Sequence, residues 1–430
     1  MINRSIKTVL CAAASLGALA VASMPAEAGG FALREQSTVG QGMSFAGVAA
    51  GGALSSMFWN PATLGAVQGI QSEQNFTLIV PITEVTAYSV LAPTTPIDQG
   101  DIGLDALVPS GYNAIRWGDF VFGLSTNGPF GLATKMPMTS PLRTLGIAGT
   151  SEVFSLNATP TVSYDVTDWL TIGAGLQIQY FDVRYTAANL GALGVSSLAG
   201  DDIGFGFTLG VLLRPMDGTE IGVGFRSSVR HDIDGRLLSP VLGNAPASLT
   251  LETPEVVTVG IRQRVTDTFT IAAGLEWANW SRLGSPNVAV NGGAINFQLP
   301  FEYEDSWFFS LGGEYAYSEA LTLRAGVGYE LSPISDDVRT FRLPDDDRLW
   351  LSAGASYRAT DAITVDLGYS FLTTFDTEIS RSAAFGGTGP TPNGPFSGEA
   401  DANVHILSLG VRIALGGPDH GGADGNVYKP

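Results

Sequence analysis

From about residue 68 to residue 415, the chain alternates apolar and polar residues in segments of roughly ten residues that turn signals separate. Apolar side chains occupy every second position in the clearest runs, which are 203–213, 269–277, 321–329 and 363–371. A period of two puts these side chains on one face of a strand. The other face holds small and charged residues together. A soluble sandwich also has one apolar and one wet face, but this mixture favours a wall with a lipid-facing exterior and a polar lumen.

Short and long connections alternate between these segments. Short turns are predicted at 118–119, 166–168, 216–219, 265–267, 317–319 and 360–361, and long connections at 81–109, 128–151, 187–201, 237–248, 282–300, 332–346 and 377–398. Such asymmetry is typical of outer-membrane barrels, which have short periplasmic turns and long extracellular loops. The predicted fold class is an all-β membrane protein, an antiparallel transmembrane β-barrel of about fourteen strands.

Residues 29–67 do not follow this pattern. They form a small, glycine-rich, apolar segment with few charges. The segment lacks strand alternation and is too short and too interrupted to span a bilayer as a helix. Because it cannot bury a core of its own, we expect it to lie inside the barrel as an N-terminal plug (hatch), with residues 68–415 forming the barrel.

The two ends of the chain are predicted to lie outside the barrel. Residues 1–28 contain Arg4 and Lys7, an apolar run and the small-residue motif 26–28. These features predict a signal peptide that is cleaved after Ala28, and the cleavage motif disfavours a retained anchor. The only cysteine, Cys11, lies in this segment, so we expect no disulfide in the exported chain. Residues 416–430 are rich in glycine and aspartate and predict a disordered polar tail.

Composition excludes several function classes. The chain has 22 basic and 41 acidic residues, a net charge of −19, which argues against nucleic-acid binding because that needs a basic surface. Mean hydropathy is +0.20, although no apolar run after the signal segment is long enough for a spanning helix. There are three histidines, and no Ser–His–acid cluster, phosphate loop or zinc spacing is recognisable. We therefore expect no enzymatic activity, no cofactor and no metal.

Several short strings, in order along the chain, resemble the FadL family of outer-membrane transporters (OMPP1/FadL/TodX-like). They are Asn60-Pro61-Ala62, Gly131-Leu132-Ala133-Thr134, Thr253-Pro254-Glu255, Trp280-Ser281, Ser332-Pro333 and the stretch 343–354. The resemblance covers residues 30–415. It implies a fourteen-stranded barrel closed by an N-terminal hatch, capture of a hydrophobic ligand by extracellular loops, and lateral release at a kinked third strand. The chain departs from barrels that end on an aromatic residue, because its last strand ends at Leu415.

Two predicted loops carry apolar residues where a plain extracellular loop would be polar. They are Leu190, Leu193, Val195 and Leu198 in the third loop, and Leu237, Leu238, Val241 and Leu242 in the fourth. Exposed apolar patches often mark binding, so we predict a ligand-capture groove here. The alternative is that the two loops merely pack against each other.

A second set of candidates belongs to the lateral gate. Phe58, Trp59, Asn60 and Pro61 close the plug. Asn60 is predicted to hydrogen-bond to backbone groups of the wall where strand pairing is interrupted. The alternative is that the aromatic residues only pack the plug against the barrel. Gly123 is the predicted bend, because a strand glycine often marks a bulge.

Three arginines on inward or rim positions, Arg262, Arg324 and Arg348, are candidates for contact with a ligand carboxylate. The alternative is that they pair with Glu276, Glu314, Glu330 or Asp366 in the lumen.

These observations predict a channel of the Gram-negative outer membrane for passive uptake of long-chain fatty acids or other hydrophobic small molecules. A monomer is expected, with lipid and ligand as its partners and no nucleic acid. Two alternatives stay open: a general diffusion porin for polar solutes, which liposome swelling would reveal, and an outer-membrane lipid hydrolase, which fatty-acid release would reveal.

Overall fold

The computed structural model describes residues 29–89, 91–144, 146–188, 195–240, 242–299, 301–375, 377–379 and 396–415. The predicted signal peptide, the predicted tail and the candidate residues Leu190, Leu193 and Val241 lie outside these ranges.

The described chain forms a closed antiparallel barrel of 14 wall strands, as predicted. Around the wall they are β1 (Ile70–Ser89), β3 (Ala106–Trp117), β4 (Phe120–Asn127), β6 (Thr150–Thr167), β7 (Leu170–Ala188), β8 (Val195–Met216), β9 (Thr219–Arg226), β12 (Val256–Arg264), β13 (Phe269–Ala278), β16 (Ser306–Ala316), β17 (Leu321–Leu331), β18 (Arg348–Arg358), β19 (Ile363–Thr374) and β21 (Phe396–Leu415). β21 pairs with β1 over the full length of both strands, which closes the sheet. Closure leaves no sheet edge facing lipid, where unpaired backbone groups would be costly.

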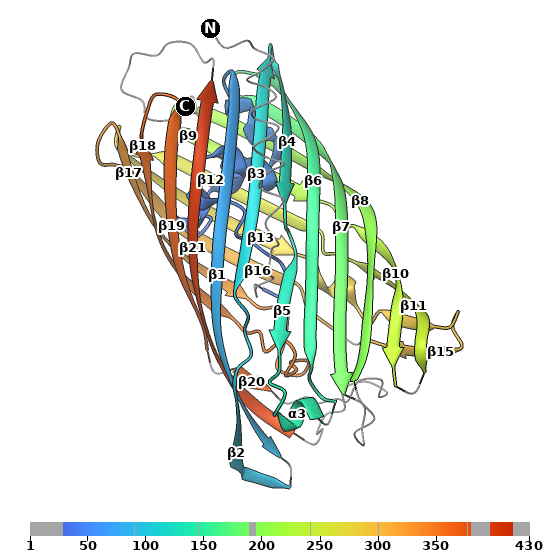
Figure 1. Cartoon of the computed structure of the whole chain (residues 1–430). Coiled ribbons are helices and arrows are strands. Elements are labelled where there is room, and N and C mark those ends of the chain that lie inside the picture. The colour runs from blue at the N-terminus through green and yellow to red at the C-terminus, as the bar shows by residue number, and fades with distance from the viewer. Residues whose placement is uncertain are drawn as a thin grey trace.

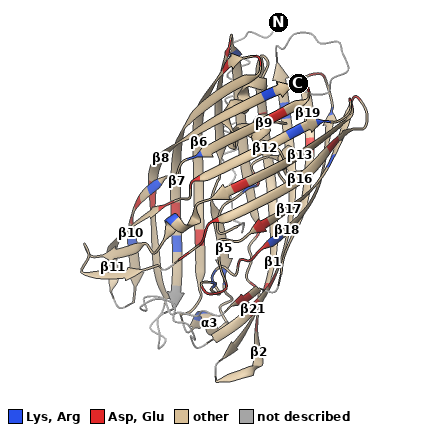
Figure 2. Cartoon of the chain, turned by 180° about the vertical axis from the view of Figure 1, so that it is seen from behind, with Lys and Arg blue, Asp and Glu red and all other residues tan. Residues whose placement is uncertain are grey.

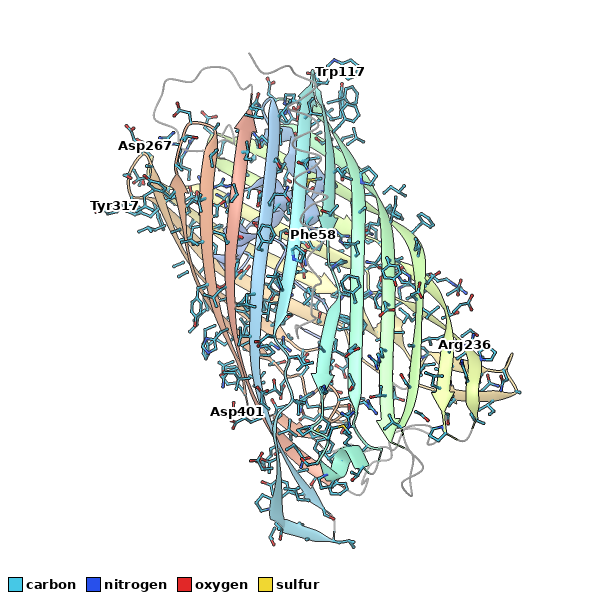
Figure 3. The ribbon with its side chains drawn as sticks, viewed as in Figure 1. Phe58, Trp117, Arg236, Asp267, Tyr317 and Asp401 are labelled. Atoms are coloured by element: carbon cyan, nitrogen blue, oxygen red, sulfur yellow. The ribbon has the colours of Figure 1, made fainter. Side chains whose placement is uncertain are left out.

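The predicted two-residue periodicity corresponds to the two faces of this wall. On β8, Ile203, Phe205 and Phe207 are 57%, 64% and 48% exposed, whereas Thr208 is buried. The exposed side chains point outward, where hydrocarbon replaces water. Most of the wall carries no charged residue in the view of Figure 2. Trp117 and Tyr317, both exposed, lie at one end of the barrel (Figure 3), as aromatic residues do at membrane interfaces.

The two ends of the barrel differ. The turns after β3, β6, β8, β12, β16 and β18 are short and share one end, at the top of Figure 1; we call it the short-turn end. The other, the long-loop end, carries β2 (Ala92–Asp101), α3 (Pro141–Thr144), β10 (Arg230–Ser239), β11 (Gly243–Glu252), η4 (Trp280–Leu283), β14 (Asn287–Val290), β15 (Ile295–Gln298) and β20 (Thr377–Ile379).

Three of the predicted long connections were wrong in kind. Most of 81–109 belongs to β1, β2 and β3, most of 187–201 belongs to β7 and β8, and most of 237–248 is the hairpin of β10 and β11. The physical reason is that backbone pairing continues beyond the membrane, whereas the apolar exterior that reveals a strand in the sequence ends with the lipid.

Residues 29–67 lie within the barrel near the short-turn end (Figure 1), as predicted for the plug. They form short helical turns: α2 (Thr38–Gln41), η1 (Val48–Ala50), η2 (Leu54–Phe58) and η3 (Pro61–Ala66). α2 contacts β18, β19 and β21, η1 contacts β9 and β12, and η3 contacts β6, β7 and β8. The plug is therefore enclosed by the wall. No helix in the described residues is long and apolar enough to cross a membrane.

Glycines on the inner face of the wall make room for the plug backbone. A Cβ at Gly222 would lie 1.8 Å from the Ala49 carbonyl oxygen, and one at Gly326 would lie 2.2 Å from the Met43 carbonyl carbon. No side chain fits at such distances. The abundance of strand glycines in the sequence thus reflects close backbone approach.

We predict that Gly326→Ala unseats the plug without opening the barrel. The added methyl group must displace the backbone at Met43, and overpacking of this kind costs about 1–3 kcal/mol. The expected result is faster proteolysis of the plug and a higher ion conductance in planar bilayers, with unchanged heat-modifiable mobility. Gly313→Ala on the neighbouring strand is the control, because its Cβ would meet only the edge of the exposed Phe269 ring, at 3.2 Å. Equal behaviour of the two variants would contradict this account.

Candidate functional site

The wall is interrupted at one side. β4 pairs with β6 as far as Asn127, and the short strand β5 (Gly131–Lys135) resumes the pairing at Gly131. The three residues 128–130 stand opposite only two residues of β6, so the wall contains one extra residue here, as in a bulge. On the other side, β3 pairs with β4 only from Gly111 onward. Residues 106–110 of β3 and the strand β5 are therefore not joined by ladder pairing, which leaves a gap in the wall.

Plug backbone closes this gap from the inside. The Leu33 N–H donates to the Pro129 carbonyl (2.8 Å), and the Gly131 N–H donates to the Phe31 carbonyl (2.9 Å). Gln36 extends the contact, because its side-chain amide donates to the Gly128 carbonyl (2.8 Å). Residues 31–33 thus take the place that a wall strand has elsewhere in the barrel.

An apolar cavity of about 180 Å³ lies on the long-loop side of this junction; we call it the outer cavity. Its lining comes from the plug, the strands β5, β6, β7, β8 and β11, Ile147, and the loops at 283–303 and 334–343. Most of its side chains are apolar: they include Phe31, Leu132, Phe181, Leu198, Leu251 and Leu343. Its charged lining residues are Glu152, Arg184 and Arg342.

Phe31 forms the inner boundary of the outer cavity. Its ring packs against Trp280 (4.7 Å between ring centroids), Phe130 (5.9 Å) and Phe181 (6.5 Å). Beyond these rings lies an inner cavity of about 60 Å³, whose lining includes Phe58, Trp59, Pro129 and Phe130. Aromatic side chains of the plug and of the interrupted wall therefore separate the outer cavity from the inner one.

The loop between β17 and β18, residues 332–347, connects the outer cavity to the plug. Phe341 and Leu343 line the cavity, and Asp345 on the same loop accepts a hydrogen bond from the Gly30 N–H (3.0 Å). Ser332 also donates to the Asp345 carboxylate (2.7 Å), and Arg348 pairs with it. A ligand that displaces this loop would act on the residue next to Phe31.

The arginines predicted to meet a ligand carboxylate are all paired. Arg324 lies 2.7 Å and Arg262 3.5 Å from Glu314, and Arg348 is bound to Asp345. The alternative, structural ion pairs, is therefore what the structure has at these positions. None of the three lines the outer cavity. Arg342, which the prediction missed, does.

Arg342 could have been suspected from its position in a long predicted connection between the apolar residues Phe341 and Leu343. In the sequence, the acidic run that follows it is the more conspicuous feature of that stretch. Those carboxylates have structural roles: Asp347 accepts bonds from the Ser332 N–H and the Tyr329 hydroxyl, and Asp346 pairs with Arg339 (3.0 Å).

The apolar residues of the two predicted loops separate into two groups. Leu198 and Leu237 are buried and stand opposite each other on β8 and β10. Leu198 lines the outer cavity, but Leu237 does not. Val195, Leu238 and Leu242 are 46%, 51% and 40% exposed and do not line the cavity. Among the described candidates, only Leu198 belongs to it, because most of this segment is paired strand rather than folded-back loop.

The candidates for the lateral gate also lie in two different places. Phe58 and Trp59 line the inner cavity together with Pro129 and Phe130 of the interruption. Asn60 does bond to wall backbone, but at Val211 of β8 (3.0 Å), and it caps η3 by accepting from the Ala62 N–H (2.9 Å). Pro61 begins that turn. Asn60 and Pro61 therefore anchor the plug away from the interruption.

The predicted bend at Gly123 is wrong. Gly123 lies within β4, in register with Ala114 on one side and Thr161 on the other. A Cβ there would lie 2.8 Å from Met57 and 2.9 Å from Leu64. The glycine makes room for the plug, and the interruption follows at 128–130.

A strand barrel with an apolar exterior, a packed plug and an apolar cavity at its long-loop end is the architecture of a plugged outer-membrane channel for hydrophobic compounds. Residues 19–415 match the family model described as outer membrane protein transport protein (OMPP1/FadL/TodX). The chain belongs to this family. It is a non-enzymatic transport protein of the Gram-negative outer membrane, and the family carries fatty acids and other hydrophobic compounds.

Relatives of similar length agree with this assignment, and solved structures share the fold. A long-chain fatty acid transport protein of Escherichia coli O6:H1 is 26% identical over 418 residues, covering 86% of this chain and 92% of the relative. The 47 kDa outer membrane protein of Pasteurella multocida is 28% identical, covering 92% and 97%. The structure of a Pseudomonas aeruginosa FadL homologue superposes with a TM-score of 0.80 at 21% identity, covering 90% and 100%. That of the Pseudomonas putida toluene transporter TodX gives 0.64 at 19%, covering 88% and 98%.

We predict that Leu198→Asn weakens binding of a fluorescent fatty-acid probe about tenfold, because it places an unpaired amide in the apolar cavity. Leu238→Asn, on the exposed face of the adjoining hairpin, is the matched control and should bind normally. Titration of both purified variants with the probe is the measurement. A loss of binding in Leu238→Asn with normal binding in Leu198→Asn would restore the loop groove as the site.

A second prediction concerns pH. Glu35 in the plug is buried, and no other described residue donates a hydrogen bond to its carboxylate. Burial raises its pKa from 4.5 to about 7; its own backbone N–H, Arg34 and Arg348 oppose this rise, and Glu330 adds to it. The proton on Glu35 therefore stabilises the seated plug below pH 4.5, and this contribution is lost as the pH rises through 7.

We expect the wild-type plug to be more resistant to proteolysis at pH 5 than at pH 8. Glu35→Gln carries a permanently neutral amide and should keep its resistance at pH 8. Other groups titrate equally in both proteins, so the difference between them isolates Glu35. A difference that stays constant from pH 5 to pH 8 would argue against a proton on this carboxyl.

Proposed function

We propose that the protein takes up long-chain fatty acids or comparable hydrophobic molecules from the cell exterior and releases them sideways into the outer membrane. Ligand enters at the long-loop end, which faces outward in outer-membrane barrels, and settles in the outer cavity. It leaves through the wall gap at residues 128–130 once plug residues 31–33 have moved.

The observation that carries this proposal is the closure of the wall gap by plug backbone, at the end of an apolar cavity. Transfer from one apolar surface to another suits a ligand for which water is the barrier, because each methylene that stays buried is worth about 0.8 kcal/mol. A straight path to the periplasm would pass the packed plug and the ion pairs of the lumen. The packed plug also argues against a diffusion porin for polar solutes.

The contact between Asp345 and Gly30 supports ligand-dependent opening. A ligand in the outer cavity touches the loop 332–347 and the ring of Phe31. Displacement of either would weaken the hydrogen bond that holds Gly30 (3.0 Å). Phe31 and Leu33, whose backbone groups bond to Gly131 and Pro129, follow Gly30 directly in the chain, so release of these bonds opens the gap.

A disulfide between plug and wall tests this route. Ala32 and Phe130 form an antiparallel bridge, and such partners have Cα atoms close enough for a disulfide. In the double variant Ala32→Cys/Phe130→Cys, we expect oxidation to abolish uptake of labelled oleate by cells, and reduction to restore it. Ligand binding to the purified oxidised protein should persist, since the outer cavity stays open to the exterior.

The control is Ala355→Cys/Leu367→Cys, a cross-strand pair on β18 and β19 with exposed Leu367. It locks the wall away from the gap and should leave uptake independent of redox state. Equal uptake by the oxidised and reduced forms of the plug-to-wall variant would contradict the proposed lateral release.

A further inference from the structure

A polar cleft of about 350 Å³ opens at the short-turn end of the barrel; we call it the basal cleft. The turns after β6 and β8 and the end of β12 contribute to its rim, and the plug contributes Gly52. Asp267, which follows β12, marks this end of the barrel in Figure 3. The short turns of outer-membrane barrels face the periplasm, so the basal cleft lies on the opposite side of the plug from the outer cavity.

Arg262 on β12 lines the basal cleft with unmet hydrogen-bonding capacity. The residue is 6% exposed, and its Nη1 has no hydrogen-bond partner among the described residues. The carboxylates of Glu314 and Glu220 lie 3.5 and 3.8 Å from its guanidinium, farther than in a normal charge-assisted hydrogen bond. A buried donor without a partner is costly. The side chain is therefore suited to an acceptor that enters the cleft.

Two more arginines line the cleft. Arg214 approaches one oxygen of the Glu220 carboxylate (3.9 Å), and Arg262 approaches the other (3.8 Å). Arg264 comes two residues after Arg262, hence on the same face of the strand, and is exposed at the rim. Three guanidiniums thus lie around the single carboxylate of Glu220. Their planar forks match the oxygens of a phosphate group.

The rim of the basal cleft adds negative charge and apolar surface. Asp168 and Asp217, in the turns after β6 and β8, are exposed. Next to them, Trp169 and Met216 are 53% and 66% exposed and also line the cleft. The lining thus contains three carboxylates and three arginines. Charge complementarity favours a molecule that carries both signs over a multivalent anion, and the apolar rim suits the uncharged part of a lipid.

The plug keeps the buried end of the cleft accessible. Gly52 has a φ of 108°, which glycine adopts far more readily than other residues. A Cβ at this position would lie 2.7 Å from the Arg262 Nη1. Any other side chain here would therefore cover the unpartnered donor.

We infer that the basal cleft binds a zwitterionic phosphoethanolamine group, carried by a phospholipid of the periplasmic leaflet or free as its glycerol ester. The phosphate accepts hydrogen bonds from Arg262, Arg214 and Arg264, and the ammonium group lies against the carboxylates of the rim. Trp169 and Met216 contact the glycerol portion. The inference goes beyond the proposed function, because the bound group is not the transported molecule and lies on the other side of the plug.

Titration calorimetry on the full-length, delipidated protein in non-ionic detergent tests the site, with glycerophosphoethanolamine as the probe. We expect Arg262→Gln to lower the affinity by about tenfold or more, because it removes a buried charge-assisted donor. Arg264→Gln should lower it by about threefold, because this arginine is exposed. Arg264 also keeps the test valid if Arg262→Gln fails to fold. Inorganic phosphate, which lacks the ammonium group, should bind the wild type about tenfold more weakly.

Arg358→Gln is the matched control. Arg358 ends β18 at the same end of the barrel, donates to the Glu319 carbonyl (2.6 Å) and does not line the basal cleft. Its variant should bind the probe as the wild type does. Heat-modifiable mobility of each variant verifies that the barrel is folded.

A second measurement distinguishes the two sources of the group. The protein is reconstituted in nanodiscs that contain equal amounts of phosphatidylethanolamine and phosphatidylglycerol, transferred to mild detergent, and analysed by mass spectrometry for retained lipid. Preferential retention of phosphatidylethanolamine that decreases in Arg262→Gln and Arg264→Gln assigns the site to the phospholipid. Binding of the free probe without such retention assigns it to the free head group.

Three results would overturn the inference: neither the probe nor phosphatidylethanolamine binds, both arginine variants behave as the wild type does, or inorganic phosphate binds as tightly as the probe. None of them affects fatty-acid binding in the outer cavity, so the proposed function would stand. Conversely, a wild type that does not bind oleate would contradict the proposed function and leave the basal cleft as a separate site.

Discussion

The structure depends on one constraint: in hydrocarbon, every backbone N–H and C=O needs a partner within the protein. The closed ladder from β1 to β21 meets this constraint around nearly the whole circumference. At residues 128–130 the ladder alone does not, and Leu33 and Phe31 supply the missing bonds. The plug therefore supplies hydrogen bonds that the wall needs to be complete. Moving it leaves buried groups unpaired at about 1–3 kcal/mol each, which keeps the gap closed in the absence of a compensating contact.

The plug is held by charge as well as by backbone. Arg34 bridges Glu276 on β13 and Glu330 on β17, and its guanidinium lies 4.0 Å from the centre of the Phe308 ring. Farther in, Arg324 pairs with Glu314, Arg262 lies between Glu314 and Glu220, and Asp366 pairs with Arg412 (2.7 Å). Charges in the lumen are thus mostly paired within the protein, as their partial removal from water requires. Arg226 and Arg342 are exceptions among the described residues: Arg226 bonds to Gln177 and to the Phe58 carbonyl, and Arg342 to Ser151 and the Thr186 carbonyl.

The fold was predictable because lipid imposes a strict two-residue period on residues such as Ile203, Phe205 and Phe207, and because short and long connections alternate. The plug was predictable since its glycine-rich sequence needs an enclosure. The functional site was less predictable from the sequence. The interruption at 128–130 is defined by pairing partners far apart in the sequence, such as Leu33 and Pro129, and no local pattern distinguishes it from the many strand glycines such as Gly123. Ion-pair choice likewise depends on three-dimensional neighbours, which is why Arg262, Arg324 and Arg348 were candidates and Arg342 was not.

The distribution of polarity along the barrel also gives the proposed route its direction. The outer cavity is apolar except for a few charged groups, and it ends at the Phe31–Phe130–Trp280 cluster. Past that cluster the lumen is filled by plug backbone in contact with wall glycines and by ion pairs such as Arg324–Glu314. An acyl chain loses apolar contact if it continues toward the short-turn end, and keeps it if it turns toward the wall at Phe130. Because the gap would open onto lipid in the membrane, the proposed lateral exit is the one along which the chain does not have to enter water.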